Sequence, residues 1–272
     1  MKKHFIYTGS RSGSNYLVSL LNSHPQITNY GEALGDWVSL YKLHSQFGLG
    51  GKSTLDYLNY IYTSPLFFSL AQVYSAIAHL RSGKPINFKG RKQVQTIGIK
   101  DFHMNLSGDK SPLWSFFEND NEMLIIHLYR ENLLKKFVSL EVMTSTKIIS
   151  SQDLNKKGSL KNQPQKLYVS PSNVLQRLEK SYAMLQERMN RLEQLPQERV
   201  IHIRYEDLFS SALSHDFYRD EIFRFLGVQP INTAINQRKI LSKNLSDIIE
   251  NYNELYEMLI KTQFAHYLNV QD

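Results

Sequence analysis

The stretch HFIYTGSRSGSNYLVSLL, residues 4–21, decides how the fold is interpreted. Residues His4 to Thr8 form a short apolar, β-rich run that ends at Gly9, which is typical of a strand. From about Asn15 onward, apolar residues recur with helical spacing. The stretch therefore predicts a strand, then a loop of glycines and serines, then a helix.

Similar apolar runs recur along the chain and predict further strands at Thr96 to Ile99, Met123 to Tyr129 and Arg199 to Arg204. Each run is short and continuous, as in strands that are buried on both faces. Helical patterns separate or follow them at Leu55 to Leu80, Leu133 to Met143, Pro171 to Leu195, Asp216 to Leu226 and Leu245 to Leu268. Strands that alternate with helices predict an α/β fold with a central parallel sheet flanked by helices.

The length of 272 residues, with 42% hydrophobic and 21% charged residues, is that of an ordinary globular protein. No internal repeat or low-complexity stretch divides it, so we expect one domain over residues 1–272. The region from about 150 to 168 is polar and not periodic. We interpret it as a mobile loop and a candidate lid.

The formal net charge of +7 favours an anionic partner without choosing among nucleotides, nucleic acids, sulfated glycans and membrane surfaces. The absence of cysteine excludes disulfides and thiolate metal sites. No apolar run reaches the roughly 20 residues that a membrane span needs. The short apolar stretch before Thr8 does not have the form of a signal peptide, and we expect a cytoplasmic protein.

The loop between the first strand and the first helix is a candidate anion site. Backbone N–H groups and the positive end of a helix favour a phosphate there, glycines allow close approach, and serine hydroxyls add donors. A simple strand-to-helix turn would also favour glycine and serine. The candidate binding residues are Gly9, Ser10, Arg11, Ser12, Gly13, Ser14 and Asn15.

A nucleoside-triphosphate loop would carry G-x-x-x-x-G-K-[ST], and residues 9–15 have no such lysine. A Gly-Lys-Ser sequence occurs at residues 51–53, but Gln46 stands where the first glycine is required, and no strand precedes it. We interpret this second stretch as a flexible turn in which Ser53 caps a helix.

Residues 11–14 (RSGS), followed by residues 20–25 (LLNSHP) and by Gly31-Glu32, resemble the 5′-phosphosulfate loop of sulfotransferases that use 3′-phosphoadenosine 5′-phosphosulfate (PAPS). The version is that of the carbohydrate, tyrosylprotein, trehalose-type and nodulation-factor-type enzymes. The cytosolic steroid and phenol enzymes usually carry Lys where this chain has Arg11. The resemblance implies a P-loop-like fold, PAPS as sulfuryl donor and no metal.

Residues 125–139 (IIHLYRENLLKKFVS) are similar to the 3′-phosphate motif of that family, with Arg130 after a strand and Ser139 on the next helix in the matching places. The planar guanidinium of an arginine can donate two directed hydrogen bonds to phosphate oxygens. In several relatives the spacing from Arg to Ser is one residue shorter. An ordinary surface salt bridge between Arg130 and Glu131 is the alternative.

Two later segments extend the resemblance. Residues 200–208 (VIHIRYEDL) resemble the strand and turn of the same enzymes, where Tyr205 would pack near the nucleotide or Asp207 would act as a cap. Residues 237–243 (QRKILSK) are similar to a C-terminal nucleotide-binding segment, and a solvated basic face explains them equally well. Their candidate contacts are Lys239, Ser242 and Lys243.

Sulfuryl transfer needs positioning and positive charge around an in-line displacement. The resemblance makes Arg11 the residue that stabilises the leaving phosphate. Glu32 stands where trehalose-type and tyrosylprotein enzymes carry a glutamate proposed as general base. His103 competes for that role, although it lies one residue beyond the Lys-x-His of the cytosolic enzymes. We favour Glu32, for which a helix-start carboxylate is the structural alternative.

The acceptor that the resemblance implies is a hydroxyl or amine of a small molecule or saccharide, and we expect no nucleic-acid partner. A P-loop kinase would share the sheet but should show the missing lysine and a magnesium-binding Asp. A polyanion-binding module is the third candidate. Its support is the net charge and a basic cluster made of Arg81, Lys84, Lys89, Arg91 and Lys92.

Overall fold

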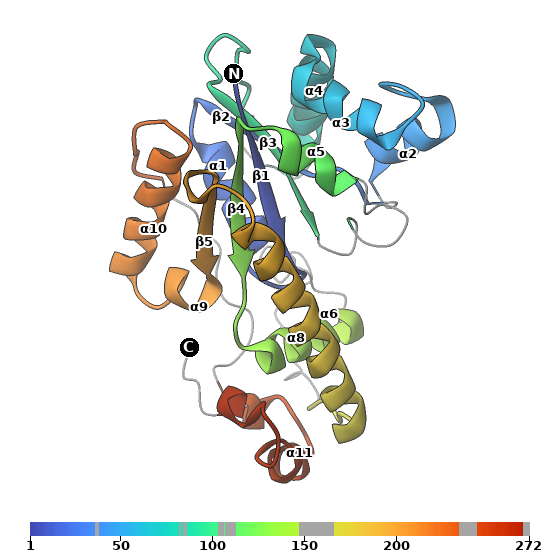
Figure 1. The fold of residues 1–272 in the computed structure, drawn as a ribbon, viewed down its shortest axis with the longest axis vertical. Coiled ribbons are helices and arrows are strands. Elements are labelled where there is room, and N and C mark those ends of the chain that lie inside the picture. Colours follow the sequence, from blue (N-terminus) through green and yellow to red (C-terminus); the bar gives the residue numbers. More distant parts are fainter. Residues whose placement is uncertain are drawn as a thin grey trace.

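The computed structural model describes residues 1–35, 38–81, 83, 86–102, 106, 113–146, 166–233 and 244–268. Its centre is a five-stranded sheet in the order β2-β3-β1-β4-β5, in which every paired strand runs parallel to its neighbour (Figure 1). The strands are β1 (Lys2–Thr8), β2 (Ile27–Glu32), β3 (Thr96–Phe102), β4 (Met123–Tyr129) and β5 (Val200–Arg204). The predicted α/β class with a central parallel sheet is therefore confirmed.

Strand β1 lies in the middle of the sheet and is completely buried from His4 to Thr8. It pairs with β3 from Lys2↔Thr96 to Thr8↔Phe102, and with β4 from Lys3↔Met123 to Thr8↔Leu128. The three strands consequently end at the same level, and the loop that follows Thr8 lies above the carboxyl edge of the sheet. Ligands of open parallel sheets bind outside this edge.

Helices surround the sheet, and Figure 1 shows α6 and α8 beyond the carboxyl ends of β1 and β4. The α-helices are α1 (Ser14–Ser23), α2 (Ser39–Phe47), α3 (Thr54–Thr63), α4 (Pro65–Arg81), α5 (Trp114–Asn119), α6 (Leu133–Thr146), α8 (Pro171–Glu193), α9 (Tyr205–Leu208), α10 (Ala212–Phe225) and α11 (Tyr252–Leu259). Short 3₁₀ helices are η3 (Gln197–Arg199), η4 (Leu245–Asp247) and η5 (Ala265–Leu268).

Alternating side chains of β1 enter two different cores. Phe5 and Tyr7 pack with apolar residues of α3, α4 and α5, while Ile6 packs with those of α1 and α10. Because both faces of the sheet are covered, the strands read as continuous apolar runs in the sequence. A third core joins α6, α8 and α11 beyond the edge of the sheet.

Some elements differ from the sequence-based expectations. The helix expected over residues 55–80 is two helices, α3 and α4, because Pro65 disfavours helical backbone at the residue before it and begins a new helix. The C-terminal helical region is divided into η4, α11 and η5. Strand β2 and helices α2 and α5 are additional elements. Ser53 caps α3 with a full capping box, as predicted.

Strand β2 was not predicted from the sequence, because the residues in its interior are polar. Asn29 is buried, its Nδ2 lies 3.0 Å from Nε2 of His4, and its side-chain oxygen accepts a hydrogen bond from the backbone N–H of Gly31. His4 Nδ1 in turn lies 3.0 Å from the hydroxyl of Thr96. This network satisfies polar groups that would be costly to bury alone, so an apolar pattern is not needed for this strand.

The predicted loop at about 150–168 falls largely outside the described residues. Within the described part, Leu167 forms a parallel β-bridge with Ile249. In the portion of the chain that the structure describes, no helix combines the length and the apolar character required to cross a bilayer.

Candidate functional site

The loop from Gly9 to Gly13 connects β1 to α1 and has an unusual backbone. Arg11 has φ 58°, in the left-handed region that non-glycine residues rarely adopt, and Gly13 at the helix start has φ 81°. The left-handed region costs a non-glycine residue roughly 1–2 kcal/mol. Strain of this kind is typical of functional loops that the surrounding structure holds in place.

Gly13 is required by a close approach as well as by its φ. A Cβ at this position would lie 3.0 Å from Cδ2 of Tyr205 and 3.1 Å from Cε2 of Phe209. Tyr205 begins α9 directly after β5, so the segment with the YEDL sequence packs against the loop. Tyr205 thus lies beside the loop, and its packing near a nucleotide stays a prediction.

Arg11 reaches from the loop to helix α6. Its Nε donates a 3.0 Å hydrogen bond to the hydroxyl of Ser139, and its Nη1 lies 3.8 Å from the sulfur of Met143. Burial and the neighbouring charge of Arg130 lower the pKa of Arg11. Two residues that are 128 positions apart, and that were assigned to different motifs, are therefore in direct contact.

Arg130 follows β4 and is 8% exposed. Its guanidinium lies over the ring of Tyr205 at 4.6 Å, and its Nε is 3.8 Å from Oε1 of Glu206. The expected alternative, a salt bridge from Arg130 to Glu131, does not match this geometry, since Glu131 forms its ion pair with Arg204 at 2.6 Å. Arg130 thus packs on the ring of Tyr205, the same ring that closely approaches Gly13 of the loop.

Glu206 and Asp207 make different contacts, and only Asp207 had been given a candidate role in the sequence analysis. Glu206 accepts hydrogen bonds from the backbone N–H groups of Glu131 and Asn132, at 3.1 and 3.0 Å, and so fixes the turn into α6. Asp207, which was considered as a cap, forms an ion pair with Arg204 at 2.5 Å. The carboxylate that organises this turn is consequently Glu206.

Glu32, the candidate base, ends β2 rather than beginning a helix, so the helix-start alternative was wrong. Its Oε1 accepts a 2.7 Å hydrogen bond from Nζ of Lys100, whose side chain is 2% exposed. The same ammonium donates to Oδ1 of Asn15 at 2.9 Å. Lys100 therefore connects Glu32 to the first turn of α1, where the loop ends.

Two further cations lie at the loop that the sequence analysis did not assign. A Cβ built on Gly9 would be 3.1 Å from Nζ of Lys136 and 3.1 Å from Nη1 of Arg188. Lys136 belongs to α6 and Arg188 to the long helix α8. A signal was present for Arg188, because it occupies a position in the buried stripe of that helix formed by Val174, Leu178, Leu185 and Leu192.

The remaining candidates divide into two groups. Ser12 and Ser14 are buried in the loop region, and the hydroxyl of Ser12 is 3.5 Å from the carbonyl of Ser10. The other group lies outside the described residues and comprises His103, Lys239, Ser242 and Lys243.

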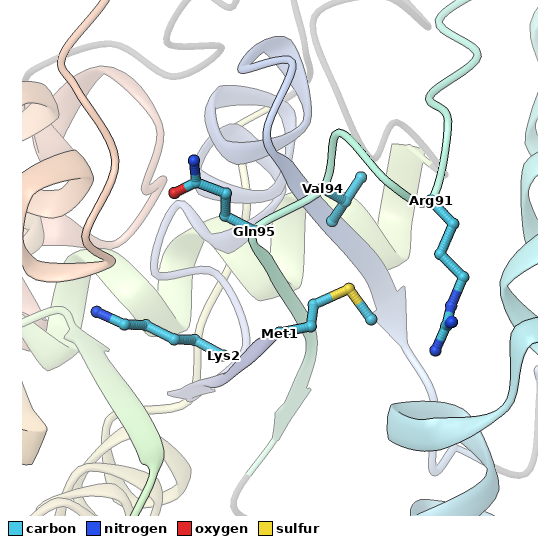
Figure 2. A pocket seen from close by; sticks show the side chains of 5 residues that line it. All are labelled: Met1, Lys2, Arg91, Val94 and Gln95. Atoms are coloured by element: carbon cyan, nitrogen blue, oxygen red, sulfur yellow. The ribbon is translucent and has the colours of Figure 1, made fainter.

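A separate hollow of about 500 Å³ lies at the opposite, amino-terminal edge of the sheet. Figure 2 shows its lining, in which Lys2 and Arg91 extend from different sides of the opening. Lys2 pairs with Thr96 at the first register position of β1 and β3, so this hollow is remote from the loop after Thr8. We assign no role in the chemistry to it.

Comparisons with known proteins complete the description of the site. No family model matches the sequence, and no curated protein matches it. The chain is similar in structure to a sulfotransferase from Alicyclobacillus acidocaldarius, with 12% identity, a TM-score of 0.44, and 100% and 97% of the two chains covered. It is also similar to a sulfotransferase domain from the curacin biosynthetic pathway, with 17% identity, a TM-score of 0.45, and 99% and 90% covered.

A third similar structure is the sulfotransferase domain of the olefin synthase of Synechococcus PCC 7002. Here the identity is 16%, the TM-score is 0.39, and 85% and 77% of the chains are covered. All three structures are of sulfotransferases, the enzyme class that the loop sequence resembles. At such identities and TM-scores the similarity carries no argument about activity, and the proposal below rests on the contacts in the site.

Proposed function

We propose that this protein is a sulfotransferase that moves a sulfuryl group from PAPS to a hydroxyl or amine of a small-molecule or saccharide acceptor. The contact between Arg11 and Ser139 carries the proposal. It brings the loop and the helix after β4 together at one edge of the sheet, with Arg130 beside them. This arrangement would suit a ligand that carries more than one anionic group, as PAPS does.

The cations fit a polyanion. Arg11, Arg130, Lys136 and Arg188 come from four different segments and lie around the loop. The ion pair that Arg130 forms with Glu206 is long, with 3.8 Å between Nε and Oε1. Cations at this density repel one another, and an anionic ligand would relieve the repulsion.

The reaction that we propose uses these residues as follows. The oxygen or nitrogen of the acceptor bonds to sulfur while Glu32 accepts its proton. The bond from sulfur to the 5′-phosphate oxygen breaks, and its electron pair stays on the phosphate. Arg11 stabilises that developing charge, and 3′,5′-adenosine bisphosphate leaves. Lys100 holds the Glu32 carboxylate in a fixed position.

Arg130 and Ser139 are the proposed ligands of the 3′-phosphate, with the Arg130 guanidinium packed over the ring of Tyr205. His103 remains the alternative base, and Lys239, Ser242 and Lys243 remain proposed nucleotide contacts. Gly9, Ser10, Ser12, Gly13, Ser14 and Asn15 are the proposed loop contacts, mainly through backbone N–H groups.

The rival functions receive less support. The Gly-Lys-Ser sequence of a kinase loop lies between α2 and α3, so no strand delivers it to the edge of the sheet. In the basic cluster proposed for a polyanion-binding module, Lys89 is 5% exposed and donates to the carbonyls of Asn22 and Ile27, so it is not available to a polyanion. Arg91 is exposed and donates to the carbonyl of Thr63.

Calorimetric titration with 3′,5′-adenosine bisphosphate, 5′-AMP and ATP-magnesium tests the proposal. We expect the bisphosphate to bind best. Arg130→Ala should weaken it by about 100-fold, because a charge-assisted pair of hydrogen bonds contributes about 3 kcal/mol. The affinity for 5′-AMP should change little. Preferential binding of ATP-magnesium, or an equal loss for both monophosphate and bisphosphate, would contradict the proposed function.

A further inference from the structure

The backbone of Gly9 is faced by two positive side chains from different helices. Nζ of Lys136 and Nη1 of Arg188 are both 3.1 Å from the position that a Cβ of Gly9 would take. Gly9 has no positive φ, so its missing side chain serves the close approach of these groups rather than the backbone conformation. The three residues form a cationic cluster that we call the Gly9 cluster.

Arg188 is buried in this cluster, and no described carboxylate balances its positive charge. It is 4% exposed, and its Nε and Nη1 atoms are buried and lack a hydrogen-bond partner among the described residues. Burial lowers the pKa of Arg188 to about 10. Within the described chain, no carboxylate pairs with Arg188 or Lys136, and leaving a buried charge unpaired is strongly unfavourable.

Packing alone does not account for an arginine at position 188. The position belongs to the buried stripe of α8, where Leu185 and Leu192 are neighbouring members. A leucine or methionine would fill it without a desolvation cost. The aromatic contact available to Arg188 is the ring of Tyr7 at 5.9 Å, a distance at which a cation-π interaction is weak. The guanidinium is therefore suited to an anion that arrives with a ligand.

The Gly9 cluster is distinct from the other cations of the site. Arg11 is directed to Ser139, and Arg130 lies on Tyr205. Lys136 interacts with both groups: burial, together with the charges of Arg188 and Arg130, lowers the pKa of Lys136 to about 8. A donor with two phosphates and one sulfo group presents separate anionic groups to such an arrangement.

We propose that Lys136 and Arg188 form an oxyanion subsite that binds the sulfo group of the donor. This inference rests on the proposed function and adds to it the residues that hold the transferring group. Arg188 supplies two directed N–H donors and Lys136 a third, which suits a tetrahedral oxyanion. During transfer the subsite would stabilise the sulfo oxygens while Arg11 stabilises the leaving phosphate.

The test compares two ligands that differ only in the sulfo group. Arg188→Met keeps an unbranched apolar chain in the stripe of α8, and Lys136→Gln keeps a hydrogen-bonding side chain without charge. In calorimetric titrations, each variant should lose about tenfold or more in affinity for PAPS. The affinity for 3′,5′-adenosine bisphosphate should stay within about twofold of the wild type.

Lys180→Met is the matched control, because Lys180 is an exposed cation on the same helix. It should leave both affinities unchanged, and near-UV circular dichroism reports whether each variant is folded. If Arg188→Met does not fold, the test passes to Lys136→Gln, since Lys136 is half-buried.

Equal losses for PAPS and the bisphosphate would overturn the subsite, as would unchanged affinity for both. A raised KM for an acceptor with unchanged PAPS binding would also overturn it, because the cluster would then serve the acceptor. Failure of the wild type to bind the bisphosphate would instead contradict the proposed function itself.

Discussion

The pair formed by Glu32 and Lys100 allows catalysis and stability to be separated. Glu32→Gln removes one charge and leaves the buried ammonium of Lys100, whose Nζ was 2.7 Å from the carboxylate, without a counter-charge. Two unit charges about 4 Å apart attract by about 4 kcal/mol at an effective dielectric of about 20. The side chain of Glu32 is 25% exposed, and solvent screening reduces the net effect to about 2 kcal/mol.

The single variant should therefore unfold at a temperature about 5 °C lower, from a shift of about 2–4 °C per kcal/mol in a chain of this size. Sulfuryl transfer should fall by about 10²–10⁴-fold, because a general base contributes that much. Adding Lys100→Met to Glu32→Gln removes the buried charge as well. We expect the double variant to regain most of its thermal stability, since neutral replacement of both partners is often harmless.

The double variant should not regain activity. The assays are thermal unfolding and transfer of labelled sulfate from PAPS to an acceptor found by screening, with Lys100→Met alone completing the cycle. Activity that returned together with stability would show that Glu32 has a structural role only. Activity of Glu32→Gln within about threefold of the wild type would refute its role as base.

Two further predictions concern the loop and its neighbours. Gly13→Ala should abolish detectable binding of 3′,5′-adenosine bisphosphate, because the backbone at this position has a φ of +81° and the new Cβ would lie 3.0 Å from the ring of Tyr205. As the control, Ser10→Ala should bind the bisphosphate within about fivefold of the wild type in the same titration. The affinity for PAPS should fall as the pH rises through about 8, since burial and the charges of Arg188 and Arg130 lower the pKa of Lys136 to about 8 and only its protonated form attracts an anion. Lys136→Gln should flatten that profile, and an unchanged slope in this variant would refute the assignment.

Local patterns predicted the centre of the molecule well. The buried strands β1 and β4 are continuous apolar runs, so their sequences reveal them. The loop after β1 was found for the same reason, because glycines and serines follow a run of this kind. Strand β2 lacks that signal, since Asn29 is buried through hydrogen bonds rather than through apolar contacts.

The site was predicted less completely, because its contacts join distant segments. Lys100 was visible in the sequence, yet nothing nearby indicates that it binds Glu32, which lies 68 positions away. Arg188 was given no role in the sequence analysis, although its place in the apolar stripe of α8 marks it as buried. Only the three-dimensional arrangement brings it to Gly9.

The central place of β1 also has a consequence for how the chain folds. Both neighbours of β1 come much later in the sequence, since Lys2 pairs with Thr96 and Lys3 pairs with Met123. Pairings of such long range slow folding, and they leave an apolar strand with open edges while the chain is being synthesised. The loop after β1 precedes β4, α6 and α8 in the chain, so its contacts with Ser139, Lys136 and Arg188 can form only after those later segments have been made.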